Sequence, residues 1–177
     1  MSSDGSTADQ FSHVTTWVFD LDNTLYPAEC HLFHQIDARM TSFIAETLDL
    51  SAVAARRIQK DYYVRYGTTL SGLMKEHHIP PKDFMRYVHD IDLSGIHRDL
   101  ALRDAIKALP GRRVIYTNGS QAHAENVAGK LGILDLFDDV FDVEMSDFTP
   151  KPQRPAYEIF WSKLGIDPQV AAMFEDM

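Results

Sequence analysis

Residues 15–24 read T-T-W-V-F-D-L-D-N-T, a short apolar run that ends on two aspartates. The first five residues are β-branched or aromatic, which is typical of a strand buried on both faces. Asp20 and Asp22 follow at once, and in a fully extended strand their side chains would share one face. A chain that leaves the strand at Asp20 lets the two carboxylates diverge around a common substrate. We therefore expect a functional site where this strand ends.

Three further runs resemble strands, at residues 113–117, 139–143 and 171–176. Helical patterns separate them, at about residues 100–109, 121–131 and 156–164. Strands that alternate with helices favour right-handed crossovers and a parallel sheet covered by helices on both faces. The sequence thus predicts an α/β fold of the Rossmann-like type.

A helical block interrupts this alternation after the first strand. Apolar residues recur at helical spacing from Leu32 to Leu48, and shorter helical patterns follow up to His89, separated by Gly67 and by Pro80-Pro81. We expect this block to be an insertion that covers the sheet as a cap. The predicted division of the chain is a disordered tail at 1–12, an α/β core at 13–29 and 94–177, and a helical cap at 30–93.

Polar residues follow each predicted strand. The carboxyl ends of parallel strands meet at one edge of a sheet, and ligands bind outside that edge. The groups expected to converge there are Asp20, Asp22, Thr117, Asn118, Lys151, Glu175 and Asp176.

These residue types suit phosphoryl transfer, which needs in-line positioning and neutralisation of charge on the phosphate. One aspartate can attack phosphorus while the other protonates the leaving oxygen, provided that their environments and pKa values differ. Thr117, Asn118 and Lys151 are suitable phosphate donors. Oxygen ligands from Asp20, Asp176 and the backbone carbonyl of Asp22 favour Mg²⁺ over zinc.

The amino-acid composition argues against some classes of ligand and of cellular location. The 177 residues carry 17 Lys and Arg against 26 Asp and Glu, so the net charge is −9, which disfavours a nucleic acid polymer as ligand. The N-terminus has neither the basic nor the apolar region of a signal peptide, and no apolar run is long enough to span a membrane. With Cys30 as its only cysteine, the protein is expected to be cytoplasmic.

Four motifs, D-L-D-N-T, Y-T-N-G-S, the lysine of T-P-K-P and F-E-D, resemble those of the haloacid dehalogenase-like hydrolase superfamily, in order and at suitable spacing. The resemblance runs from about Thr15 to the end of the chain. It implies Asp20 as nucleophile, Asp22 as general acid and then base, and Asp176 as a magnesium ligand with Glu175 behind it or acting through water. It also implies Thr117 and Lys151 as phosphate ligands.

The resemblance extends to the class of reaction and of substrate. Phosphatases and phosphomutases of the superfamily carry an acid at the position of Asp22, whereas its dehalogenases lack one. The insertion resembles a type I cap, and D-L-D-N-T-L-Y-P with Y-G-T-T-L-S-G-L-M is similar to the pyrimidine 5′-nucleotidase branch. This implies a small phosphorylated metabolite such as UMP or CMP as substrate.

Alternatives stay open at this point. Another small-molecule phosphatase or a phosphomutase would carry the same motifs. Members of the superfamily usually continue beyond the fourth motif, so part of the C-terminal core is expected to be missing, with low stability as a result. A catalytically incomplete fold that acts as a binding subunit is the third possibility, and the sequence does not predict the oligomeric state.

Several other side chains could have either a structural or a functional role. Tyr62, Tyr63 and Tyr66 could stack on a nucleobase or pack within the cap, and Tyr26 could face the substrate. His31 and His34 lie one helical turn apart, but without a third ligand a surface or hinge role is favoured over a metal site.

Overall fold

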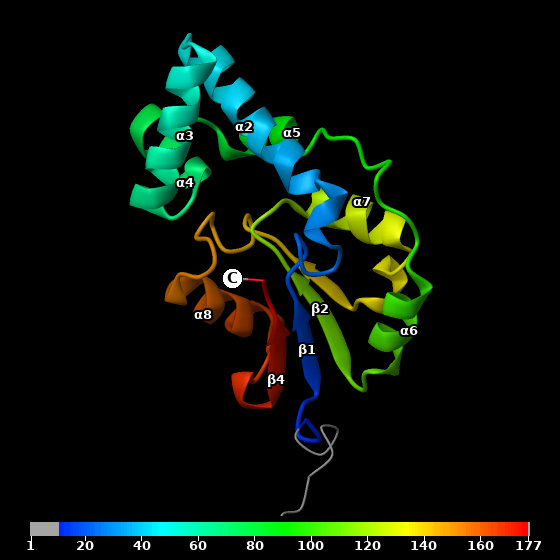
Figure 1. Ribbon diagram of the computed structural model, residues 1–177. Coiled ribbons are helices and arrows are strands. Elements are labelled where there is room, and N and C mark those ends of the chain that lie inside the picture. The colour runs from blue at the N-terminus through cyan, green and yellow to red at the C-terminus, as the bar shows by residue number, and fades with distance from the viewer. Residues whose placement is uncertain (1–10, 177) are drawn as a thin grey trace, which may run out of the picture.

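A computed structural model describes residues 11–176. Within them lies a four-stranded sheet with the order β3-β2-β1-β4, and every pair of neighbours in it is parallel. Its strands are β1 (Thr16–Phe19), β2 (Arg112–Tyr116), β3 (Asp139–Phe141) and β4 (Ala171–Phe174). The sequence-based prediction of a Rossmann-like parallel sheet is confirmed, and β1 lies at its interior (Figure 1).

Helices cover both faces of this sheet. On one face α6 and α7 pack against Trp17 and Phe19 of β1, and on the other face α8 packs against Val18. Alternate residues of β1 therefore enter different cores, as the period of a strand requires. The bounds of these helices are α6 (Leu100–Ala108), α7 (Gln121–Leu131) and α8 (Arg154–Leu164), with short 3-10 turns at Ala28–Cys30, Leu134–Leu136 and Pro168–Val170.

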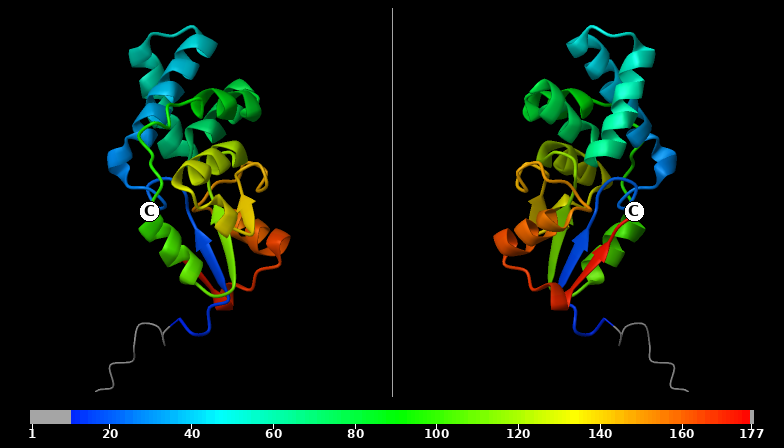
Figure 2. Two further views of the ribbon diagram at one scale, coloured as in Figure 1. Left: turned by 90° about the vertical axis from the view of Figure 1, so that its right-hand side faces the viewer. Right: turned by 90° about the vertical axis from the view of Figure 1, so that its left-hand side faces the viewer.

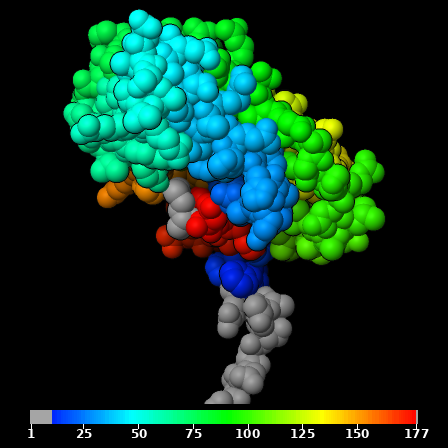
Figure 3. All heavy atoms as spheres, turned by 45° about the horizontal axis from the view of Figure 1, so that its top comes forward, coloured from blue at the N-terminus to red at the C-terminus, as the bar shows by residue number. Residues whose placement is uncertain are grey.

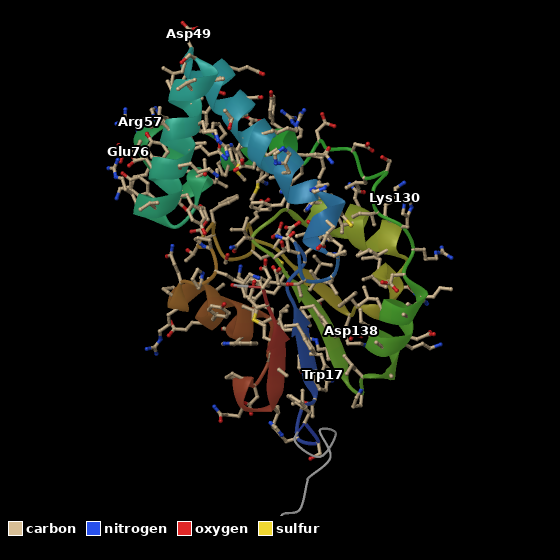
Figure 4. All side chains as sticks on the ribbon, viewed as in Figure 1. Trp17, Asp49, Arg57, Glu76, Lys130 and Asp138 are labelled. Atoms are coloured by element: carbon tan, nitrogen blue, oxygen red, sulfur yellow. The ribbon has the colours of Figure 1, made fainter. Side chains whose placement is uncertain are left out.

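The inserted helices form a layer with its own apolar core. Phe43 and Ile44 of the first helix pack with Leu73 and Phe84 of the later ones. Figures 1 and 2 show this helical block beyond the end of the sheet at which β1 and β4 terminate. Asp49 lies at its outer tip, while Trp17 lies far below it in the sheet layer (Figure 4). The helices are α2 (Leu32–Leu48), α3 (Ala52–Tyr66), α4 (Thr69–His77) and α5 (Pro81–Val88).

The strands predicted at 139–143 and 171–176 both end two residues earlier than expected. The first stops at Phe141, and beyond it the Asp142 carboxylate accepts the backbone N–H groups of Gln121 and Met145. The strand predicted at 171–176 stops at Phe174, so Glu175 and Asp176 extend beyond the sheet edge. Both carboxylates are thereby released from the sheet.

The expected N-terminal tail at 1–12 falls mostly outside the described residues, and only Phe11 and Ser12 can be placed. These two lie in a turn, and the ring of Phe11 contacts Trp17 with centroids 6.0 Å apart. The division of the chain at residues 30 and 93 stays a prediction. Among residues 11–176 no helix combines the length and apolar character needed to cross a bilayer.

Gly111 sets the close approach between the turn before β2 and the start of β1. Its φ is +85°, and a Cβ there would lie 2.2 Å from the carbonyl oxygen of Thr15. That carbonyl accepts the N–H of Arg112 at 2.9 Å, so it cannot withdraw without breaking a bond that aligns the two strands.

We predict that Gly111→Ala lowers the free energy of unfolding by roughly 3 kcal/mol or more, because backbone strain and a clash with fixed backbone add. Gly165→Ala is the matched control, since Gly165 also has a positive φ of 62° but open space around it. Its cost should be about 1–2 kcal/mol. Urea unfolding of both variants tests this, and equal losses would contradict the close approach.

Candidate active site

Each of the four strands delivers polar side chains to one edge of the sheet. Asp20 follows β1 directly, Thr117 follows β2, and Glu175 follows β4, while Lys151 lies on the loop after β3. The ammonium of Lys151 lies 2.7 Å from a carboxylate oxygen of Asp20 and 2.7 Å from one of Glu175. Asp20, Lys151 and Glu175, which the sequence predicted to converge from the ends of β1, β3 and β4, are therefore in direct contact.

Lys151 is the centre of this arrangement. Its side chain has no exposed surface, and its ammonium lies over the ring of Tyr116, 5.1 Å from the centroid. A buried ammonium has to be paired, and Asp20 and Glu175 supply that pairing. Lysine carries three N–H donors. Two are used within the described residues, which leaves one donor for another acceptor.

Three carboxylates form a candidate metal site beside Lys151. One oxygen from each of Asp20, Glu175 and Asp176 lies within 4.8 Å of the others. Opposite ligands of octahedral Mg²⁺ are about 4.2 Å apart, so a small adjustment would seat the ion. With one ammonium against three carboxylates, the cluster carries two excess negative charges when ionised. Both the oxygen donors and this charge fit a divalent hard cation.

The make-up of this cluster differs from the sequence-based prediction in one respect. Glu175 was expected behind the metal ligands, but it is one of the three grouped carboxylates. Asp22 was expected to contribute its backbone carbonyl, and its carboxylate is not part of the group. Asp176 is exposed, and Figure 3 shows the last described residues, in red, at the surface below the helical block. The metal-binding roles of these residues stay predictions.

Burial and the neighbouring Lys151 have opposite effects on the pKa of Asp20. It is 6% exposed, and its second carboxylate oxygen accepts the hydroxyl of Thr24 at 3.0 Å. Burial raises the pKa of Asp20 from 3.8 to about 6, with Lys151 opposing the rise and the charges of Glu175 and Asp22 adding to it. A bound cation would lower that pKa, as a nucleophile requires.

Asp22 has a different environment, because the turn after Asp20 directs it away from Lys151. Its Oδ1 accepts the hydroxyl of Tyr26 and lies 3.0 Å from Nε2 of His123. Burial would raise the pKa of Asp22, but the hydrogen bond and charge of His123, with the bond from Tyr26, outweigh it and lower that pKa. The two aspartates do have unlike pKa values, yet Asp20 has the higher one in the ligand-free chain.

Thr117 and Asn118 lie at the start of the loop after β2. Thr117 is fully buried, and its hydroxyl accepts the N–H of Gly119 at 2.8 Å. Both ends of the Asn118 carboxamide bind the backbone of Lys151, at 2.8 and 3.1 Å. The Asn118 side chain therefore holds Lys151 in place, and its expected contact with phosphate stays a prediction.

Side chains of the protein bind two of the backbone N–H groups at the N-terminus of α7. Ser120 caps the helix by accepting the N–H of His123 at 3.3 Å, and the Asp142 carboxylate accepts the N–H of Gln121 at 3.0 Å. The chain's own side chains thus occupy two of the donors at this helix end.

Two site residues, His123 and His89, were missed by the sequence-based interpretation. His123 is 2% exposed on α7, and its ring stacks on His89, with centroids 4.3 Å apart and planes 11° apart. His89 follows the last helix of the block, and its Nδ1 lies 2.9 Å from the hydroxyl of Ser120. Each is a single histidine in an apolar helical pattern, a signal that a buried structural histidine gives equally well. Tyr26, considered a candidate to face the substrate, binds Asp22 instead.

A cavity of about 300 Å³ lies between the helical block and the sheet edge. Asp22, Asn118 and Gly119 line it on the sheet side. The block contributes mainly apolar side chains and a few polar ones. These include Phe33, Ile36, Met40, Leu70, Phe84, Met85, Val88, Gln59, Lys60, Tyr63, Thr68 and Thr69.

The three tyrosines of α3 have separate roles. Tyr63 lines the cavity, whereas Tyr62 is buried in the block and its hydroxyl lies 2.7 Å from Nε2 of His77. Tyr66 packs edge-on against Tyr62 and binds Glu76. Neither His31 nor His34 belongs to a metal-ligand cluster among residues 11–176.

Comparison with known proteins shows the family of this chain. The family model for haloacid dehalogenase-like hydrolases matches residues 14–177. Phosphate metabolism protein 8 of Saccharomyces cerevisiae (strain ATCC 204508 / S288c) is 27% identical over 175 residues, covering 89% of this chain. The match covers 54% of that relative, so the chain spans about half its length.

Solved structures share the fold at low sequence identity. A HAD phosphatase from Thermococcus onnurineus has a TM-score of 0.54 and 16% identity, over 90% of this chain and 76% of the other. A dehalogenase with an intermediate complex has a TM-score of 0.52 and 16% identity, over 91% and 76%. Such likeness establishes the fold alone. With a family model that spans nearly its whole length, the chain belongs to the haloacid dehalogenase-like hydrolases.

Proposed function

We propose that the protein is a magnesium-dependent phosphomonoester hydrolase that forms an aspartyl-phosphate on Asp20. The observation that carries this proposal is the placement of Asp20 at a strand end, bound to Lys151 at 2.7 Å and grouped with two further carboxylates. Asp22, in a separate environment, lines the adjacent cavity. A second aspartate at this position favours a phosphatase over a dehalogenase, although both occur among the structural neighbours.

The proposed reaction has two displacements. The Asp20 carboxylate attacks phosphorus, an O–P bond forms, the bond to the leaving oxygen breaks, and Asp22 gives that oxygen a proton. Asp22 then takes a proton from water as the water attacks the aspartyl-phosphate, which releases phosphate and restores Asp20. The negative charge of a bound phosphate raises the pKa of Asp22, which favours its acid role.

Charge neutralisation falls to Lys151 and the metal site. Asp20, Glu175 and Asp176 would hold Mg²⁺, together with the backbone carbonyl of Asp22. The ion would supply positive charge for the phosphate oxygens and lower the pKa of Asp20. Lys151 offers its remaining N–H to the phosphate, and Thr117 its hydroxyl, while Asn118 keeps Lys151 in register.

We propose pyrimidine nucleoside 5′-monophosphates as substrates and the cytoplasm as the location. The cavity volume is at the lower end of the range for small-molecule pockets, and its apolar lining suits a planar base. Tyr63 offers an aromatic face, and Thr68 offers a hydroxyl group. A phosphomutase would use the same site, but a sugar hydroxyl would receive the phosphoryl group instead of water.

Replacing Asp20 tests the covalent route. We expect Asp20→Asn to lower magnesium-dependent phosphate release from UMP, CMP and p-nitrophenyl phosphate by more than about 1,000-fold, because the amide is not a nucleophile. Asp135→Asn, which removes an exposed carboxylate paired with Arg103, should retain full activity. Release that persists in Asp20→Asn or without magnesium would refute the proposal.

Magnesium affinity should depend on the proton at Asp20. Its pKa, raised to about 6, means that the carboxyl binds a proton as the pH falls below 6, and the ion must displace that proton. We expect Mg²⁺ to bind about tenfold more weakly at pH 5 than at pH 7. Calorimetric titration at both pH values measures this, and an affinity that does not change with pH would argue against Asp20 as a ligand.

Substitution of Tyr63 tests whether the cavity holds a base. Loss of a stacked ring costs about 1 kcal/mol, so Tyr63→Ala should raise KM for UMP about fivefold and leave KM for glycerol phosphate unchanged. Tyr66→Ala is the control, because Tyr66 packs on Tyr62 and does not line the cavity. Equal changes in KM for the two substrates would show that Tyr63 does not contact the base.

A further inference from the structure

The hydrogen bonding around Asp22 is one-sided. Within residues 11–176, both side-chain hydrogen bonds to its carboxylate fall on Oδ1, one from the hydroxyl of Tyr26 and one involving Nε2 of His123. An ionised carboxylate only accepts hydrogen bonds, so Nε2 of His123 has to carry a proton and donate it. Oδ2 is left for the cavity that Asp22 lines.

His123 is itself held from several sides. It is 2% exposed, and its ring lies flat on that of His89 at 4.3 Å. Burial, with the charge of His123, lowers the pKa of His89 to about 3, so His89 is a neutral ring above that pH. A Cβ on Gly119 would lie 3.4 Å from the His123 ring and 3.5 Å from that of His89. The stack therefore fits closely against the loop after β2.

The two rings come from different layers of the molecule. His123 belongs to α7, which packs on the sheet, and His89 follows α5 of the helical block. His89 also reaches the hydroxyl of Ser120, the residue that caps α7. The contact thus links the position of the block to the residue that binds Asp22.

We propose that His123 is a positioning residue that turns Oδ2 of Asp22 toward the substrate, and that His89 holds the His123 ring in that role from the helical block. The proposal rests on the phosphatase function proposed above. It assigns neither histidine a contact with the substrate. Because Asp22 acts in both displacements, loss of its orientation impairs turnover more than substrate binding.

Two amides of different length at position 123 test the hydrogen bond. The amide nitrogen of His123→Gln can occupy the place of Nε2, whereas that of His123→Asn is one methylene too short to reach Asp22. A displaced catalytic group costs on the order of 100-fold. We expect His123→Asn to lower kcat for UMP by about that factor with little change in KM, and His123→Gln to recover most of the loss.

The same substitution with Asp22 already replaced separates positioning from general packing. If His123 acts through Asp22, then adding His123→Asn to Asp22→Asn should lower turnover of p-nitrophenyl phosphate less than about threefold further. His77→Asn is the control, because His77 binds the hydroxyl of Tyr62 inside the helical block. Its effect should be the same whether or not Asp22 is present. Melting temperatures show that each variant is folded.

Additive losses from His123→Asn and Asp22→Asn, or equal losses from the glutamine and asparagine variants, would overturn the proposal. Wild-type protein without magnesium-dependent turnover would overturn the proposed phosphatase function instead.

Nitrogen-15 NMR spectra of labelled histidine test the protonation of His123 without an activity assay. The proposal predicts a protonated Nε2 on His123 in the wild type, and an unprotonated Nε2 there would contradict it.

Discussion

The buried ammonium of Lys151 is the constraint on which the site depends. It joins the loop after β3 to Asp20 at the end of β1 and to Glu175 at the end of β4, with both distances at 2.7 Å. Removing one partner of a buried ion pair leaves an uncompensated charge at a cost of about 3–5 kcal/mol. Asn118 fixes the lysine backbone through two further hydrogen bonds. The strand ends are therefore brought together by charge as well as by the sheet.

Lys151 also gives the two aspartates of the first motif different environments, because it binds Asp20 and not Asp22. Asp20 shares Lys151 with Glu175 and lies in one cluster with Asp176, and this acidic surplus suits a divalent cation. Asp22 turns toward Tyr26 and His123, which lower its pKa, while burial raises that of Asp20 to about 6. A cation beside Asp20 and a phosphate beside Asp22 would shift these pKa values in opposite directions. The order of the two pKa values, with Asp20 above Asp22, therefore belongs to the chain without the charges of the cation and the phosphate.

Much of this could be predicted from the sequence, because the strands and helices are local patterns and parallel strands share one edge. The convergence of Asp20, Lys151 and Glu175 followed from strand ends alone. His123 and His89 could not be found this way, since a lone histidine at an apolar helical position carries no sign of its partner. The use of the Asn118 carboxamide on Lys151 was equally hidden, because two loops with no fixed spacing set it. The helices and strands could be predicted from the sequence, but these side-chain contacts between them could be found only in the structure.

The central claim is that Asp20 carries the phosphoryl group during turnover. Its most direct test is to quench the protein during turnover of UMP with magnesium, reduce acyl-phosphates with borohydride, and map the modified residue by mass spectrometry. Reduction of an aspartyl-phosphate gives homoserine, and the account predicts homoserine at position 20 only when substrate and magnesium are both present. Steady turnover with an unmodified Asp20, or with the modification at another carboxylate, would contradict it.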